Sequence, residues 1–200
     1  MGVSEKRDQL FEVVEAQHGV FTTKQAVDAG YDRNTHAYQV RSGYWIRECR
    51  GIYRLAHYHY DEESEFVIWS LWTRDREEHV QGVYSHATAL AMFDLSDLNP
   101  SKLHITVSRS FRKNCIIPSH LVFHTGELSV DDIEARQGYS LTTPIRTIAD
   151  LCREESLDRD IIGQAISQAI QRGFISQRER KGALSSSSFP EWAKDIFKKG

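Results

Sequence analysis

The sequence predicts an α+β protein: an N-terminal winged helix-turn-helix followed by a mixed α/β domain with a small sheet and several helices. Two observations lead to this fold class. Residues 19–55 follow the order helix, short turn, helix and basic hairpin, which is the order of a winged helix domain. From residue 65 onwards, a strongly apolar helix precedes short apolar strands and further helices, which indicates a second hydrophobic core.

The first helix is expected from residue 5 to about residue 18, with Ser4 as its cap. Val20 and Phe21 are expected to form a small strand that pairs with the wing. Apolar side chains recur in the helix at helical spacing and are predicted to face the core; they are Leu10, Phe11, Val13 and Val14.

Two short helices follow. The first, TKQAVDAG, is capped by the Thr22–Thr23 pair and ends at Gly30, because a glycine takes the left-handed conformation that ends a helix at little cost. Asp32 is expected to cap the second, RNTHAYQVRS, which ends at Gly43. This second helix occupies the position of a recognition helix, which enters the major groove of DNA.

The stretch YWIRECRGIYRL is rich in aromatic and β-branched residues and predicts a two-stranded hairpin. Its turn lies at Arg50–Gly51, where a glycine accepts positive φ. Arg47 and Arg50 are candidates for phosphate or minor-groove contact. Arg54 is either a further candidate or the partner of Glu48 across the hairpin.

Helical spacing assigns the faces of the recognition helix. Ala37 and Val40 are expected to face the core, followed by Tyr44 and Trp45. Arg, Asn and Gln side chains on the other face can make two hydrogen bonds to one base edge, and polar residues at a helix start suit phosphate contact. The alternative is that these side chains are only solvated. The predicted DNA-binding residues are Thr22, Thr23, Lys24, Arg33, Asn34, Thr35, His36, Gln39, Arg41, Arg47 and Arg50.

The charge distribution supports a local interface. The chain has a formal net charge of −3, yet residues 22–55 contain six bases and three acids. A basic face on an acidic protein is typical of a chain that touches DNA with one module. An ordinary surface helix and hairpin can show the same excess by chance.

The expected domains are residues 1–56, the winged helix; residues 62–184, the α+β domain; and residues 185–200, a linker and a C-terminal helix. The second domain is predicted to open with a helix over residues 65–78. Ser85 is predicted to cap a short helix, and Thr143 a helix over residues 145–154 that begins at a proline. Strands are expected at residues 102–107, 121–124 and 138–141, and further helices at residues 161–172, 177–184 and 189–199.

No metal or cofactor is expected. His57 and His59 could share an ion, but no third ligand stands at a suitable distance. Cys49, Cys115 and Cys152 lack the paired spacing of a disulfide framework or a zinc ribbon, so three free thiols are predicted.

Catalysis is not expected either, because Ser85 lacks the glycine-flanked elbow of a hydrolase nucleophile. Arg146 and Asp150 stand four apart on one helix and can simply pair. The polar residues of the second domain are assigned a structural or effector-facing role; they are His86, Thr88, Arg109, Arg112, Arg146 and Asp150.

No apolar run reaches the length that spans a bilayer. The N-terminal stretch mixes charged and apolar residues and lacks the apolar core of a signal peptide. A soluble, cytoplasmic protein is therefore expected.

The chain resembles the AbiEi antitoxins of bacterial type IV toxin–antitoxin systems, within a broader group of transcriptional regulators. The stretch GVFTTKQAVDAGYDRNTHAYQVRSGYWIRECRGIYRL resembles the winged helix domain of that family nearly end to end. In the second domain the matching segments are, in order, YSHATALAMFDL, KLHITVSRSFR, GYSLTTPIRTIADLCRE and IIGQAISQAIQRGFIS.

The resemblance implies an autorepressor that binds double-stranded DNA at inverted repeats in its own promoter. It also implies a functional partner, a nucleotidyltransferase toxin counteracted without a stable complex during phage defence. One alternative is a stand-alone regulator whose second domain senses a ligand or oligomerises. Another is a nucleic-acid-processing enzyme, since some relatives carry a restriction-endonuclease-type domain. Such a metal-dependent site needs an acid followed by a Glu/Asp-x-Lys pair, and no such arrangement is identified in a strand context; Glu191 and Lys194 are three apart with no strand around them.

Overall fold

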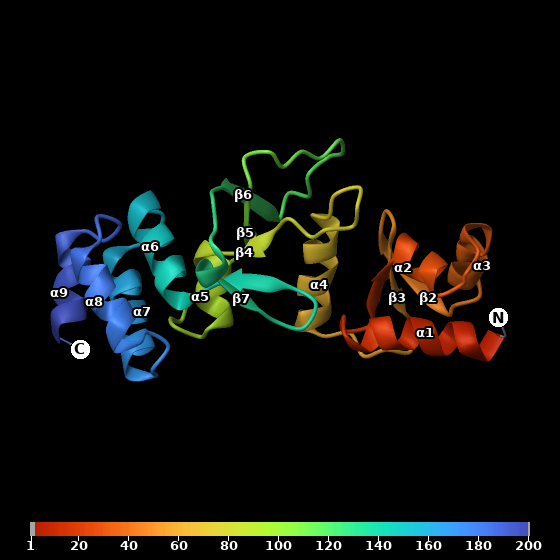
Figure 1. Ribbon diagram of the computed structural model, residues 1–200, viewed down its shortest axis with the longest axis horizontal. Coiled ribbons are helices and arrows are strands. Elements are labelled where there is room, and N and C mark those ends of the chain that lie inside the picture. Colours follow the sequence, from red (N-terminus) through yellow and green to blue (C-terminus); the bar gives the residue numbers. More distant parts are fainter. Residues whose placement is uncertain (1–2, 200) are drawn as a thin grey trace. The chain divides into compact units, whose positions relative to one another are not determined.

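The computed structural model describes residues 3–199 (Figure 1). The chain consists of two compact units. The first unit contains the residues up to Gly82 together with Ala135–Ser140. The second contains Val83–Glu134 and the residues from Leu141 onwards. Both units combine helices with a β-sheet, so the predicted α+β class is confirmed.

The N-terminal part of the first unit contains three helices and a three-stranded antiparallel sheet. Its elements are α1 (Val3–Glu15), β1 (Val20–Thr22), α2 (Thr23–Asp28), the 3₁₀ turn Arg33–Thr35, α3 (His36–Arg41), β2 (Trp45–Cys49) and β3 (Ile52–Leu55). The strand order is β1-β3-β2, so β1 pairs with the wing as the sequence predicts. The buried core of this part consists of Leu10, Val14, Phe21, Ala26, Ala29 and Trp45.

Three details of α1 differ from the sequence prediction. The helix ends at Glu15 rather than near residue 18. Ser4 lies inside the helix, where its hydroxyl donates to the Asp8 carboxylate at 3.5 Å, so it does not act as the cap. Phe11 is 46% exposed, because the apolar stripe is narrower than the spacing suggested.

The ends of the two short helices follow the sequence signals. Thr22 caps α2 through a reciprocal pair with Gln25: its hydroxyl accepts from the Gln25 amide, and the Gln25 side chain accepts from the Thr22 amide. Gly30 has a φ of +88° after the helix ends. Asp32 accepts from the amide of Asn34 and so starts the 3₁₀ turn instead of a regular α-helix.

The helix α4 (Glu62–Trp72) belongs to the first unit, because it packs on β1 and β3. The division at Gly82 therefore differs from the boundary expected near residues 56–62. Asp61 caps α4 by accepting from the Ser64 amide at 2.8 Å. The helix ends at Trp72, well before the predicted residue 78.

Residues 135–140 complete the first unit. The Tyr139 hydroxyl donates to the Glu63 carboxylate at 2.6 Å, and its ring packs on Phe66 with ring centroids 5.5 Å apart. Gln137 donates to the backbone carbonyl of Glu15. This short segment therefore joins the first unit although it lies far along the sequence.

The second unit contains a five-stranded mixed sheet of order β6-β5-β4-β8-β7. Strand β5 runs parallel to β6 and antiparallel to β4, which is parallel to β8. The elements are β4 (Val83–Tyr84), α5 (His86–Met92), β5 (Leu103–Val107), β6 (Leu121–Thr125), β7 (Ile133–Ala135), β8 (Ser140–Thr142), α6 (Pro144–Glu154), α7 (Arg159–Gln171), α8 (Gln177–Ser185) and α9 (Glu191–Lys199).

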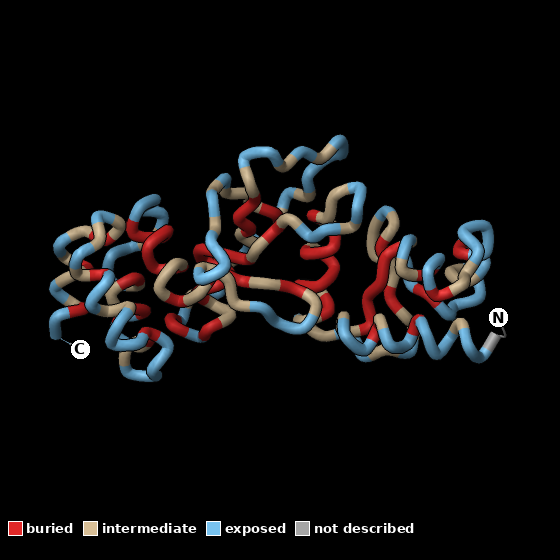
Figure 2. Tube along the Cα trace, in the orientation of Figure 1, coloured by how far each residue is buried: buried red, intermediate tan, exposed pale blue. Residues whose placement is uncertain are grey.

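Buried residues concentrate along α4 in the first unit and along α5 and α6 in the second (Figure 2). Helix α6 begins at Pro144 and buries Ile148, Leu151 and Cys152, as the sequence predicts. Helix α9 contacts α7 and α8 and buries Phe197 completely, so the predicted tail helix is part of the second unit.

The three cysteines are free thiols, as predicted. Cys49 is half-buried, Cys115 is exposed and Cys152 is buried. Burial raises the pKa of Cys152 to about 11, so this thiol stays protonated near neutral pH.

Candidate nucleic-acid interface

A cleft with a volume of about 1110 Å³ lies in the first unit, lined by residues of α2, the recognition helix α3 and the wing. Six basic residues line it: Lys24, Arg33, Arg41, Arg47, Arg50 and Arg74. Among the described residues that line it, Glu78 is the one acid. This basic cleft brings together bases from separate elements on one face, as an interface for an anionic polymer requires.

Arg74 holds the rim of the basic cleft in place. It pairs with Glu78 at 3.0 Å and donates to the backbone carbonyls of Gly51 at 3.1 Å and Leu71 at 2.7 Å. These contacts join the segment that follows α4 to the turn of the wing. The other five bases of the cleft are exposed, and their charge is available to a ligand.

Arg33, Ala37 and Arg41 recur at a spacing of four along the recognition helix and all line the basic cleft. The predicted inward placement of Ala37 is wrong, because Ala37 is exposed. Tyr44, also predicted to follow the core, is 58% exposed. Val40 is half-buried and packs against the core, and Trp45 is buried, as predicted.

The sequence predicts that His36 contacts DNA; His36 is among the residues around the basic cleft, but its side chain is buried in the core. The side chain is only 3% exposed, and its ring packs against Trp45 and Tyr53 with centroids 5.1 and 5.8 Å away. Burial lowers the pKa of His36, and a smaller contribution from the Tyr31 backbone opposes the shift. His36 is therefore a neutral core residue near pH 7.

Thr22 is also removed from the set of DNA-contacting residues. It is 1% exposed, and its hydroxyl is engaged in the cap of α2. Its neighbours Thr23 and Lys24 line the basic cleft, and their contact with phosphate stays a prediction.

Asn34, Thr35 and Gln39 do not line the basic cleft. The backbone N–H of Asn34 donates to the Asp32 carboxylate, and the Thr35 hydroxyl donates to the backbone carbonyl of Asp32. Their side chains are exposed, whereas Gln39 is half-buried. A contact from these residues to a base edge stays a prediction.

The alternative left open for Arg54 is resolved in favour of a pair. Its guanidinium donates to Glu48 at 2.8 Å and to the Tyr58 carbonyl at 3.3 Å. The group also lies 4.7 Å from the centre of the Tyr60 ring. With 9% of its surface exposed, Arg54 stabilises the hairpin and does not face the cleft.

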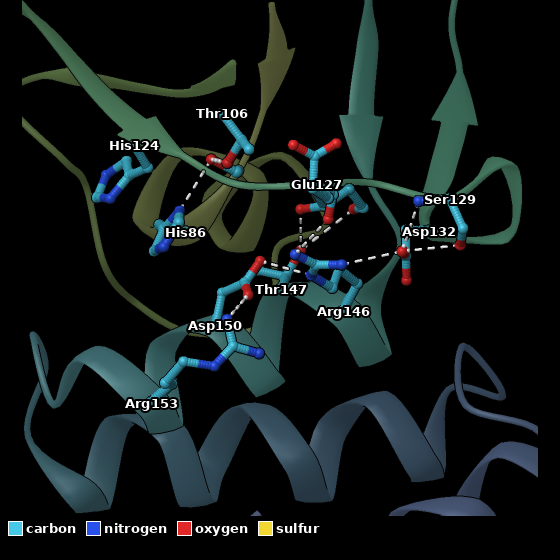
Figure 3. A network of polar contacts seen from close by, with 12 residues as sticks. His86, Thr106, His124, Glu127, Ser129, Asp132, Arg146, Thr147, Asp150 and Arg153 are labelled. Carbon is cyan, nitrogen blue, oxygen red and sulfur yellow. Dashed lines mark hydrogen bonds and ion pairs between the residues drawn. The ribbon is translucent and has the colours of Figure 1, made fainter. Parts of the chain in front are cut away.

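Several of the polar residues predicted in the second unit form one network (Figure 3). Arg146 on α6 donates to Asp150 and Asp132, each at 2.9 Å, and to the Glu127 carbonyl at 3.1 Å. Asp150 is 3% exposed and also accepts from Arg153. Burial raises the pKa of Asp132, but hydrogen bonds from Ser129 and the charge of Arg146 outweigh this effect, so the pKa is lowered overall. The predicted pairing of Arg146 with Asp150 is thus observed.

Thr88 is 2% exposed, and its hydroxyl accepts from the His104 amide at 2.7 Å. It therefore holds α5 against β5 and does not face an effector. Arg109 and Arg112 are exposed in the connection between β5 and β6, where Arg112 donates to the Arg109 carbonyl at 2.9 Å. They stand apart from the Arg146 network.

Ser85 occupies the cap position of α5 but makes no capping hydrogen bond with its side chain. Its hydroxyl instead lies 2.9 Å from Nδ1 of His86 and accepts from Thr106 at 2.8 Å. The predicted capping role is therefore replaced by a contact that orients the His86 ring. His86 itself has a φ of +52°, an uncommon conformation for a residue with a side chain.

A histidine cluster that the sequence did not reveal surrounds His86. Nε2 of His86 and Nδ1 of His124 lie 3.1 and 3.0 Å from the same oxygen of Glu154. Nε2 of His124 lies 2.9 Å from Nδ1 of His104. The three histidines and Glu154 come from α5, β6, β5 and α6, so only the fold brings them together.

Burial and mutual interactions shift the pKa values of three members of this cluster. Burial, and then the nearby His124, lower the pKa of both His86 and His104, the latter to about 4. Burial raises the pKa of Glu154, but the interactions with His86 and His124 outweigh this effect, so the pKa is lowered overall. At neutral pH, neutral imidazoles at His86 and His104 accompany a carboxylate.

Residues 8–56 match the family model described as "Transcriptional regulator, AbiEi antitoxin". The match confirms, for this segment, the resemblance expected from the sequence. It ends one residue after β3, so the resemblance of the second-unit segments stays a prediction.

The fold is similar to that of the RV2827C protein from Mycobacterium tuberculosis, whose crystal structure aligns with a TM-score of 0.56. The alignment covers 96% of this chain and 77% of that chain at 12% sequence identity, so the likeness concerns the fold alone. No curated protein matches the sequence. Among the described residues, no helix has the length and apolar character needed to cross a membrane.

Proposed function

We propose that this chain is a DNA-binding transcriptional repressor of its own promoter and acts as the antitoxin of a nucleotidyltransferase toxin. The observation that carries DNA binding is the basic cleft over the recognition helix and the wing. The match of residues 8–56 to antitoxin regulators supports the regulatory role. Counteraction of the toxin without a stable complex rests on resemblance.

The proposed contacts divide into two kinds. Arg33 in the 3₁₀ turn and Arg41 in the recognition helix are proposed to read base edges, because both are exposed and line the cleft and arginine can make two hydrogen bonds to guanine. Lys24, Arg47 and Arg50, which also line the cleft, are proposed to contact phosphates. Removing the first kind should lower affinity and specificity, whereas removing the second should lower affinity for every sequence.

A gel shift with the protein's own promoter fragment, run over a salt series, tests the interface. We expect Arg33→Ala with Arg41→Ala to abolish retardation at moderate salt. We expect Arg47→Ala with Arg50→Ala to weaken binding to all fragments. It should also reduce the slope of log K against log salt by about 0.9 for each phosphate that the variant no longer neutralises.

The matched control is Arg178→Ala with Lys181→Ala, which removes two exposed positive charges from α8 in the second unit. Its binding should equal that of the unmodified chain. If both the control and the recognition-helix variant lower affinity equally, net charge alone explains binding and the recognition-helix assignment fails.

The antitoxin role is tested separately. Co-expression with a nucleotidyltransferase encoded directly downstream should relieve the growth arrest that this toxin causes. A stand-alone regulator would bind the promoter but give no relief.

A further inference from the structure

We propose that His86, His124 and Glu154 form a binding site for a divalent transition-metal ion, best suited to Zn²⁺. The site lies wholly in the second unit and is independent of the proposed DNA interface. Its three potential ligand atoms are Nε2 of His86, Nδ1 of His124 and a carboxylate oxygen of Glu154, and all lie within 4.8 Å of one another.

The spacing of these atoms fits a small ion. The two nitrogens lie 3.1 and 3.0 Å from the Glu154 oxygen. Zinc bonds to nitrogen and oxygen are about 2.0–2.2 Å long, which puts neighbouring ligands of a tetrahedral site about 3.3 Å apart. An ion at the centre therefore requires shifts of tenths of an ångström in these two distances.

The outer contacts of both imidazoles are those of metal ligands. A ligating histidine donates its second ring N–H to a neighbouring group, which fixes the tautomer and the ring orientation. Nδ1 of His86 lies 2.9 Å from the Ser85 hydroxyl, which Thr106 also contacts. Nε2 of His124 lies 2.9 Å from Nδ1 of His104. Each ligand nitrogen can therefore present its lone pair to the ion.

The same atoms can also form a cluster without an ion, in which Glu154 accepts one N–H from each imidazole. The rings of His86 and His124 are stacked with centroids 3.6 Å apart and planes 13° apart. Because a metal lies near the plane of each ligating ring, binding must turn these stacked rings relative to each other. Ion binding is therefore expected to change the environment of both rings, which histidine NMR signals report.

Two features of the cluster favour Zn²⁺ over harder ions. Two imidazoles and one carboxylate suit zinc, whereas Mg²⁺ and Ca²⁺ prefer oxygen ligands. The Glu154 side chain is 38% exposed, whereas that of His86 is 4% exposed. The ion thus has a route from solvent and a fourth position that water can fill, as in zinc sites with three protein ligands.

The test uses the full chain after dialysis against a chelator. Zn²⁺ is added in competition with a chromogenic zinc indicator, and Co²⁺ is then used to record the visible absorption of a four-coordinate site. We expect one equivalent of Zn²⁺ to bind. Glu154→Gln and His124→Gln should each lower the affinity by more than about tenfold, since even outer-contact changes cost that much.

The matched control is His57→Gln with His59→Gln, which removes an exposed pair of histidines from the first unit. Its affinity should be unchanged. Glu154→Gln keeps the shape of an exposed side chain, and circular dichroism will verify that it folds. Absence of stoichiometric binding overturns the proposal, and so does loss of binding in the control variant with retention in Glu154→Gln.

Discussion

Arginines that look equivalent in the sequence of the wing have different environments. Arg50 is exposed at the turn and lines the basic cleft. Arg54, four residues later, is largely buried and paired with Glu48. The alternation of a strand predicts two faces, but it does not tell which face meets the core and which meets a ligand. The pairing of Arg54 was therefore only one of two options until the register of β2 and β3 was known.

The placement of His36 shows the limit of helical spacing in a short helix. Within α3, His36 stands four residues before the half-buried Val40 and Ala37 stands three residues before it. At about 100° per residue, both side chains lie within about 60° of Val40, on opposite sides of it. Spacing alone therefore does not tell which of the two enters the core; the fold buries His36 and exposes Ala37.

Burial of His36 predicts acid sensitivity of the first unit. Its folded-state pKa is lowered from 6.5, so the unfolded chain takes up the proton first as the pH falls. The resulting stabilisation is complete above about pH 6.5 and is lost as the pH falls towards the folded-state pKa. We expect His36→Phe, which keeps an aromatic ring beside Trp45 and Tyr53, to lose less stability than the unmodified chain when the pH falls from about 7.5 to about 5.

The measurement is urea unfolding at several pH values, compared between the two proteins. The difference between them isolates His36 from the other titrating groups. Parallel stability curves for the two proteins would contradict a neutral, buried His36.

Among the elements, those with local signals were predictable and those that depend on distant partners were not. The Thr22–Gln25 cap, the glycines after α2 and α3, and the Ser176 cap of α8 are all written in short stretches of sequence. Strands β4 and β7 contain only two and three residues and exist through pairing with other strands. Periodicity alone does not identify segments this short; the expectation for β1 came from its place in the winged helix order.

The cap of α2 is predicted to stabilise the whole winged helix, because this helix lines the basic cleft. Thr22→Ala removes the side-chain acceptor of the Gln25 amide, which should lower the free energy of unfolding by about 1 kcal/mol. Thr22→Ser keeps the hydroxyl and should cost less. Urea unfolding followed by the fluorescence of the core residue Trp45 measures both. Equal losses in the two variants would mean that the missing methyl group, and not the cap, explains the effect.

At the scale of the whole chain, the sequence predicts the winged helix module but not the extent of the unit to which it belongs. The apolar side chains of α4 predict that the helix is buried, but they do not predict in which core. The helix belongs to the first unit. Local sequence patterns likewise do not predict that residues 135–140 belong to the first unit. The histidine cluster has the same origin, because His86, His124 and Glu154 are distant in sequence and meet only across α5, β6 and α6.

The observed division predicts how fragments of the chain behave. A fragment of residues 1–56 lacks α4, and with it the Ser64 hydroxyl that donates to the His18 carbonyl and the Arg74 contact to the wing. A fragment of residues 1–82 keeps these contacts and every residue that lines the basic cleft. It lacks Tyr139, whose removal alone should cost about 3–5 kcal/mol for a buried aromatic ring. Stability of the first unit should therefore fall in the order full chain, residues 1–82, residues 1–56.

Urea unfolding followed by tryptophan fluorescence measures this order, because all three chains contain Trp45 of the first-unit core. Tyr139→Ala in the full chain serves as the matched control: it should bring the first unit close to the stability of the 1–82 fragment. The promoter gel shift should show that residues 1–82 bind with the salt dependence of the full chain, since the basic cleft is complete. If residues 1–56 were as stable as residues 1–82 and bound as well, α4 would not belong to the DNA-binding unit, and the boundary expected from the sequence would be the correct one.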